Sequence, residues 1–293
     1  MDASVLPLAR ASAADWLELT KPRITLLVVF TALVGFVSAT SASPWTNLLL
    51  AALGGTGLVA AGASVLNQVM ERATDALMHR TRNRPIPAGR IGHAEATLFG
   101  ALLTLAGLVI LATLCGPLAA FVALSTWASY LFLYTPLKRR SHLATIVGAV
   151  PGALPPVIGW AAASGSLEPG AFILFAIVFL WQIPHFLAIA WLYRDDYERG
   201  GFPMLPVIDR EGRLTARQAV LHSVALLVVS LAPVAAGLGG RLYLVGALVL
   251  GVGLTLSALR LSRERDLAAA RFLFLASLLY LPALTSLLLL ANL

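Results

Sequence analysis

The chain has 293 residues, of which 59% are hydrophobic and only 12% are charged, and its mean hydropathy is +0.85. Polar side chains this sparse cannot cover the surface of a soluble protein of this size, so the composition excludes a soluble globular fold and predicts an integral membrane protein. The long Leu, Ala and Val runs lack the alternation of barrel strands, so we expect an all-α bundle of transmembrane helices.

Nine stretches without charge are long enough to span a membrane, and we expect them to form one transmembrane domain over residues 1–293. A short arm, 1–22, precedes the first span. Its acidic residues Asp2, Asp15 and Glu18 come before Lys21 and Arg23. This is not the order of a cleaved signal peptide, so no removable targeting segment is expected. The predicted spans are 24–39, 46–66, 96–115, 117–134, 143–163, 171–192, 219–238, 242–259 and 272–290.

The 21 Lys and Arg residues lie in the arm and in alternate loops, so all but Arg241 share one side of the membrane. By the positive-inside rule that side is the cytoplasm of a bacterium, with the protein in the plasma membrane, or the matrix if this is a mitochondrial inner-membrane protein. The N-terminus is therefore expected in the cytoplasm. This topology also explains the basic pI near 10.2, so we expect no nucleic-acid partner.

The first acidic loop continues the second span without a break. If the helix persists, Asn67, Glu71 and Asp75 lie on one helix face, because residues four apart are offset by only about 40°. Stacked oxygen ligands suit Mg²⁺, which uses few carboxylates and leaves room for phosphate oxygens. Such spacing is also found at ordinary solvated helix ends, but a run of basic side chains that complements a diphosphate follows here: Arg80, Arg82 and Arg84.

The second acidic loop follows the sixth span and contains Asp195, Asp196 and Tyr197. It comes four spans after the first acidic loop, and an even number of spans preserves the side of the membrane. We therefore expect the two loops on the same side, and we hypothesise that spans one to four and five to eight are parallel repeats whose acidic loops face each other, with span nine as an addition. This arrangement would place a binding site at the cytoplasmic face.

His185 is the one histidine deep inside a predicted span, within the segment Trp181-Gln-Ile-Pro-His185-Phe, whereas His222 lies near the loop at the start of its span. Ionisable groups in the membrane are functional candidates by default, although a neutral histidine bonded to a neighbouring carbonyl is an equal alternative. The Gly and Pro residues of the fifth span, at 148–159, predict a broken helix that serves either as a cavity wall or for close packing.

The sequence lacks the motifs of several other enzyme classes. No phosphate-binding loop, paired Cys-x-x-Cys or His-Glu-x-x-His zinc motif is present. The single cysteine, Cys115, allows no internal disulfide and no cysteine-based metal site.

The segment Asn67-x-x-x-Glu71-x-x-x-Asp75, followed by Arg80-Thr-Arg-Asn-Arg84-Pro, resembles the first aspartate-rich motif of the UbiA prenyltransferase family, with Glu71 where the family usually has Asp. The heme O synthase branch of that family is the most similar. Further marks of the branch lie at 134–139, 152–160, 181–186, 196–197 and 201–206, so the resemblance covers roughly residues 65 to 210.

This resemblance implies a UbiA-type bundle with a central cavity open to the cytoplasm, transfer of farnesyl from farnesyl diphosphate to a vinyl group of heme B, and Mg²⁺ as cofactor. His185 would ligate the heme iron or position a water molecule. The resemblance also suggests that the product is handed over to a heme A synthase or a terminal oxidase. No residue of the sequence shows this handover. Implied metal ligands are Asn67, Glu71, Asp75 and Asp195 or Asp196; implied substrate-binding residues are Arg80, Arg82, Arg84, Lys138, Arg139, Asp195, Tyr197 and Trp181.

Two alternatives remain from the sequence. A UbiA enzyme that prenylates an aromatic quinone precursor would share the metal site but would not bind heme through His185. A small secondary transporter would also have broken helices and polar groups at mid-membrane, but it would not release diphosphate in a metal-dependent reaction.

Overall fold

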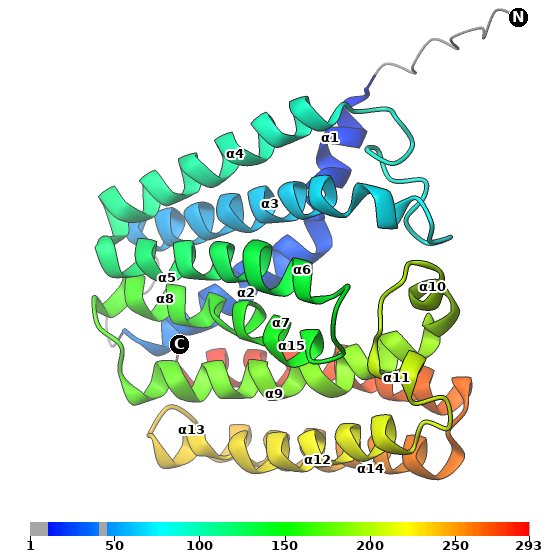
Figure 1. The fold of residues 1–293 in the computed structure, drawn as a ribbon. Helices are drawn as coiled ribbons and strands as arrows, with labels where there is room; N and C mark the ends of the chain where they lie inside the picture. The colour runs from blue at the N-terminus through cyan, green and yellow to red at the C-terminus, as the bar shows by residue number, and fades with distance from the viewer. Residues whose placement is uncertain (1–10, 41–45, 293) are drawn as a thin grey trace, which may run out of the picture.

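A computed structural model describes residues 11–40 and 46–292 of the chain; the first ten residues of the predicted arm lie outside this range. All regular structure in the described residues is helical (Figure 1). The helices of the first half are α1 (Ala13–Leu19), α2 (Pro22–Ser38), α3 (Asn47–Asp75), α4 (His93–Ile110), the π-helix η1 (Leu111–Cys115), α5 (Pro117–Ala128), the π-helix η2 (Ser129–Tyr134) and α6 (Thr135–Leu137). Those of the second half are α7 (Ala144–Ala153), α8 (Pro155–Ser164), α9 (Pro169–Leu192), α10 (Arg194–Arg199), α11 (Leu205–Ile208), α12 (Arg213–Val229), α13 (Ala232–Ala235), α14 (Arg241–Glu264) and α15 (Leu267–Asn292).

Eight stretches of the described chain are long and apolar enough to cross a membrane, and a ninth is obtained if α1 and α2, which are bent by 49°, count as one span. The predicted all-α transmembrane fold is therefore confirmed. The first predicted span corresponds to α2, whose 17 residues extend about 26 Å, near the lower limit for crossing the hydrocarbon core.

The main difference from prediction is at the end of the second span. We predicted its end at residue 66, but α3 continues to Asp75. Charged side chains end a hydrophobic run, but they do not interrupt backbone hydrogen bonds, so the helix continues beyond its apolar part. This extension carries the first acidic motif.

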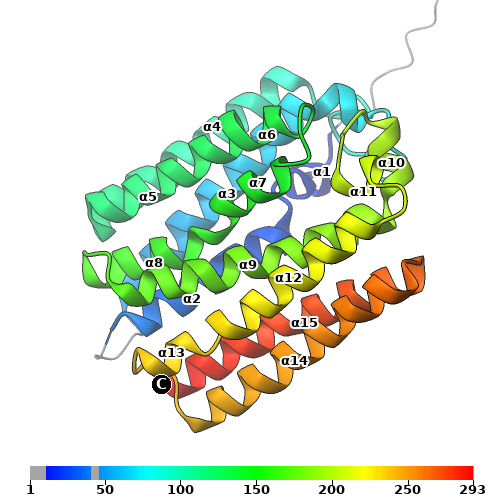
Figure 2. The ribbon, with the colours of Figure 1, turned by 60° about the horizontal axis from the view of Figure 1, so that its bottom comes forward.

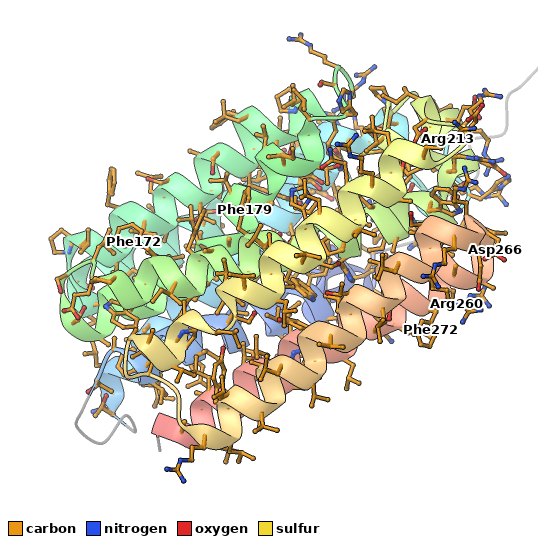
Figure 3. All side chains as sticks on the ribbon, turned by 90° about the horizontal axis from the view of Figure 1, so that it is seen from below. Phe172, Phe179, Arg213, Arg260, Asp266 and Phe272 are labelled. Atoms are coloured by element: carbon orange, nitrogen blue, oxygen red, sulfur yellow. The ribbon has the colours of Figure 1, made fainter. Side chains whose placement is uncertain are left out.

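The helices run roughly along a common direction in three groups (Figures 1 and 2). One group contains α3, α4 and α5, a central group contains α2, α8 and α9, and the third contains α12, α14 and α15. Contacts of α2 with α3 and of α5 with α8 join the first group to the central one, and contacts of α9 with α12 and α15 join the central group to the third. Seen from below, Arg213, Arg260 and Asp266 lie at one end of the bundle and Phe172 at the other (Figure 3). We call the end with Arg213, Arg260 and Asp266 the polar end; the loop after α3 and helices α10 and α11 also lie there (Figure 1).

The fifth span is broken at Leu154, between α7 and α8, as its prolines predicted. Its glycines serve close packing: a Cβ atom on Gly159 would lie 1.9 Å from the backbone oxygen of Ala32 in α2, and one on Gly152 would lie 2.0 Å from Oε1 of Gln182 in α9. These contacts support the packing role over the cavity-wall role at these two glycines. Close backbone approach, as between Gly159 and Ala32, is a general means of joining helices in lipid.

The described part of the N-terminal arm folds onto the polar end. Ser12 caps α1 through a reciprocal pair of hydrogen bonds with Asp15, and Asp15 also accepts a hydrogen bond of 2.7 Å from Arg90. Trp16 packs edge-on against Phe99 of α4 at 5.0 Å between ring centroids. This anchoring fixes the following turn, in which Lys21 has a left-handed φ of 48°.

Candidate active site

Three oxygen-bearing side chains form a buried row on the extension of α3. Asn67 and Asp75 are each 1% exposed and Glu71 is 7% exposed. The helix is continuous through all three, so the predicted common face is confirmed. The row points into the protein and not into solvent, which is against the alternative of an ordinary solvated helix end.

Each member of the row has a cationic partner from a different segment. Lys138 Nζ, just after α6, donates to both oxygens of Glu71 at 2.7 and 3.0 Å. Arg84 donates to Asp75 Oδ2 at 2.7 Å, and Lys21 Nζ donates to Asn67 Oδ1 at 3.2 Å. Two carboxylates and one amide oxygen therefore each accept a hydrogen bond from a basic side chain. The bonds to the carboxylates are charge-assisted, and bonds of this length are among the stronger hydrogen bonds in proteins.

The second acidic loop meets the first, as predicted. Asp196 of α10 accepts hydrogen bonds of 3.2 Å from the backbone N–H groups of His79 and Arg80, and Arg199 forms an ion pair with it. Burial by itself would raise the pKa of Asp196, but the Arg199 guanidinium and the two backbone donors outweigh it and lower the pKa. Asp196 therefore joins the two loops as an anion.

The remaining predicted residues of the loops are more exposed. The Asp195 side chain is 80% exposed, with Arg194 at 3.9 Å, and Tyr197 packs edge-on against Phe202. Arg82 and Arg139 are exposed, and neither forms an ion pair within the described residues.

A cavity of about 830 Å³ opens at the polar end, between the end of α9 and the turn that joins α14 to α15. Both loop carboxylates, Asp195 and Asp196, line it, together with Trp191, Arg194 and Arg265. Arg80 lies over the ring of Tyr193 at 5.5 Å, at the side of this cavity nearest the first loop.

His185 belongs to α9 and faces α15. Its ring stacks on Trp181 with 4.9 Å between centroids and lies 5.3 Å from the ring of Phe274. Its Nδ1 is 2.8 Å from Ser277 Oγ, and Trp181 Nε1 donates to the backbone oxygen of the same serine at 2.7 Å. The partner of this histidine is thus a serine hydroxyl, not the neighbouring carbonyl of the alternative above.

Sequence reasoning missed two polar residues that complete these clusters. By its sequence position Lys21 is only a basic residue of the arm, and Ser277 lies in the last predicted span, which contains no motif. No local pattern marks either contact, because Lys21 is 46 residues from Asn67 and Ser277 is 92 residues from His185. Both were detectable only as polar residues in or beside apolar helices.

Among residues 11–40 and 46–292, no group of three or more His, Cys, Asp or Glu side chains is placed to hold a metal ion. The donor chemistry of the row nevertheless fits Mg²⁺: one amide oxygen and two carboxylates, all buried on one face. Mg²⁺ in phosphate-transfer sites takes one or two carboxylates and completes its shell with water and substrate phosphates, so three acidic ligands are not required.

Comparison with known proteins identifies the family. Residues 28–279 match the model of the UbiA prenyltransferase family. The chain belongs to the UbiA prenyltransferase family. Among curated UbiA relatives, a protein of Solibacter usitatus named protoheme IX farnesyltransferase is 50% identical, with 94% of this chain and 98% of the relative covered. A protein of Opitutus terrae with the same name is 46% identical, with 95% of each chain covered.

Solved structures show the same UbiA fold. A structure from work on digeranylgeranylglyceryl phosphate synthase aligns with a TM-score of 0.79 at 16% identity, covering 95% of this chain and 98% of the other. A UbiA homolog from Archaeoglobus fulgidus bound to GPP and Mg²⁺ aligns with a TM-score of 0.65 at 14% identity, covering 94% and 99%. At this identity the likeness concerns the fold alone.

Proposed function

We propose that this UbiA prenyltransferase transfers the farnesyl group of farnesyl diphosphate to a vinyl group of heme B, giving heme O and diphosphate. The observation that carries the proposal is the buried row of Asn67, Glu71 and Asp75 with its cationic partners, in a chain that matches proteins named protoheme IX farnesyltransferase over almost its whole length. The row supports binding of the diphosphate group of the substrate, and the relatives support heme as the acceptor of the farnesyl group.

The metal would be held by the α3 row together with Asp195 or Asp196. Asp196 is the second-loop carboxylate that contacts the first loop, whereas Asp195 has the more exposed oxygens. When bound there, Mg²⁺ would supply Lewis-acid stabilisation of the charge that develops on the departing diphosphate.

The cationic side chains act on the same charge. Lys138, Arg84 and Lys21 contact the row directly, and Arg80 lies on the first loop over the ring of Tyr193. In the reaction the C1–O bond of farnesyl diphosphate breaks, the electron pair leaves with diphosphate, and these groups stabilise the new charge in a site with little water. We assign lesser roles in substrate binding to the exposed Arg82 and Arg139, and to Tyr197.

The allylic cation then receives electrons from the vinyl group of heme B. A carbon–carbon bond forms, and the positive charge moves to the carbon next to the porphyrin. Water adds to that carbon and loses a proton, which leaves the hydroxyethylfarnesyl side chain of heme O. His185, stacked on Trp181, would bind the heme iron or position this water.

The site would open to the cytoplasm in a bacterial plasma membrane, with the N-terminus also cytoplasmic. Support comes from the basic residues at the polar end, where Arg213 and Arg260 lie (Figure 3), because positive charge accumulates on the cytoplasmic side of membrane proteins. We further propose that residues 1–293 act as one domain, since α9 contacts helices of both halves. The apolar product would pass to a heme A synthase or a terminal oxidase.

The test is to incubate detergent-purified protein with heme B, farnesyl diphosphate and Mg²⁺ and to look for farnesylated heme by liquid chromatography and mass spectrometry. We expect the product with wild type, its loss on metal chelation and in Asp75→Ala, and normal activity in the matched control Glu168→Ala, an exposed carboxylate outside the row. Transfer to a phenolic acceptor in place of heme would refute the acceptor but keep the metal site. Absence of metal-dependent diphosphate release with any acceptor would favour a transporter.

A further inference from the structure

Ser277 of α15 makes two short contacts through a single hydroxyl group. Its Oγ lies 2.7 Å from the backbone oxygen of Phe274 in its own helix and 2.8 Å from Nδ1 of His185 in α9. The residue is fully buried. One hydroxyl has one hydrogen to donate, so only one of these two contacts can use it.

The position of that hydrogen follows from the oxygen contact. Two oxygen atoms 2.7 Å apart are at hydrogen-bond distance only if a hydrogen lies between them. The carbonyl of Phe274 has none, so the serine hydroxyl must donate to it. Ser277 Oγ then faces His185 with a lone pair, and Nδ1 of His185 must carry the proton and donate it.

The consequence concerns the other ring nitrogen. A neutral imidazole with its proton on Nδ1 has an unprotonated Nε2. In the part of the chain that the structure describes, Nδ1 has a hydrogen-bond partner and none is found for Nε2. The rings of Trp181 and Phe274 hold the imidazole plane at 21° and 30° to their own, so the direction of Nε2 is fixed as well.

We propose that Ser277 is a positioning residue that holds His185 in the Nδ1–H tautomer, so that Nε2 serves as the nitrogen ligand of the heme iron. This inference rests on the proposed function and decides between its two roles for His185. Histidines that bind metals characteristically donate their second N–H to a protein acceptor, which sets the tautomer and makes the ligand more basic. Here the acceptor comes from α15.

The tautomer is measured first, without heme. The chain has 5 histidines, and nitrogen-15 NMR of histidine-labelled protein assigns His185 by the signal lost in His185→Gln. We expect Nδ1–H in wild type and in Ser277→Thr, which keeps the hydroxyl, and a shift toward Nε2–H in Ser277→Ala. The matched control is Ser223→Ala, another fully buried serine whose hydroxyl bonds only its own helix, at Ala219. An Nε2–H signal in wild type overturns the inference.

Heme binding is measured second, by titrating ferric heme B and recording the absorption and electron paramagnetic resonance of the heme iron, which report its axial ligand. We expect a nitrogen ligand that is absent in His185→Gln, and an affinity reduced about 10- to 100-fold in Ser277→Ala, with Ser277→Thr and Ser223→Ala close to wild type. Binding of farnesyl diphosphate with Mg²⁺ should stay unchanged in Ser277→Ala; an equal loss there would show a merely structural role and overturn the inference.

The two levels of the proposal fail in different ways. If wild type farnesylates heme but Ser277→Ala binds heme as tightly, the inference about Ser277 is wrong and the proposed function stands. If wild type neither binds nor farnesylates heme, the heme acceptor is refuted and the ligand role of Nε2 with it.

Discussion

Removing the positive charge of Lys138 should destabilise the protein, apart from any effect on catalysis. In Lys138→Met the Glu71 carboxylate, 7% exposed, loses a partner that now holds both of its oxygens. Leaving one charge of a buried pair without its partner costs about 3–5 kcal/mol. Lys138 is itself 14% exposed and lies at the polar end, so we expect the lower limit, about 3 kcal/mol of unfolding free energy.

The double variant Lys138→Met/Glu71→Gln separates charge from packing. Two neutral groups leave no unpaired charge, so we expect it to recover about 2 kcal/mol of the loss, while farnesyl transfer stays abolished in both variants. Unfolding in mixed micelles followed by circular dichroism gives these differences. The control is Arg210→Met in the exposed pair with Glu198, whose side chains are 76% and 51% exposed; its effect should be at most about 1 kcal/mol. A double variant no more stable than Lys138→Met would refute this reasoning.

Three further outcomes follow. Gly159→Ala should cost about 1–3 kcal/mol of unfolding free energy, because the new Cβ would lie 1.9 Å from the backbone oxygen of Ala32; a melting temperature equal to wild type would contradict the packing described above. Arg84→Gln should lower the rate of farnesyl transfer by at least about 10²-fold. The control Arg82→Gln should change the rate only slightly, because Arg82 is exposed and forms no ion pair within the described residues. Equal losses in the two variants would argue against a direct role for Arg84. The pKa of Asp196 is lowered in the folded protein. The stability that the ionised Asp196 contributes is therefore present above its unfolded pKa of about 3.9 and is lost as the pH falls through its folded pKa. Acid unfolding of Asp196→Asn should accordingly depend less on pH than that of wild type.

The sequence predicted the helical membrane fold because each transmembrane helix satisfies its own backbone and must be apolar along its length. It also predicted that Asn67, Glu71 and Asp75 share a face, because helical periodicity is a local property. The even number of spans between the two acidic loops predicted that they lie on the same side, and the hydrogen bonds that Asp196 accepts from the first loop show that they meet. The helix ends were less predictable, since α3 continues nine residues beyond the predicted end at 66.

What the tertiary structure decided is which groups are partners. Lys138 is 67 residues from Glu71, and no spacing rule relates such positions. In lipid, apolar surfaces pack against one another without strong preference. Which helices meet is therefore selected by the close packing of small residues and by hydrogen bonds between polar groups. That packing brings Lys21, a basic arm residue by its sequence, to the buried row. It also brings the hydroxyl of Ser277 to His185. Because that hydroxyl donates to Phe274, Nδ1 of the imidazole is the donor and Nε2 is left free.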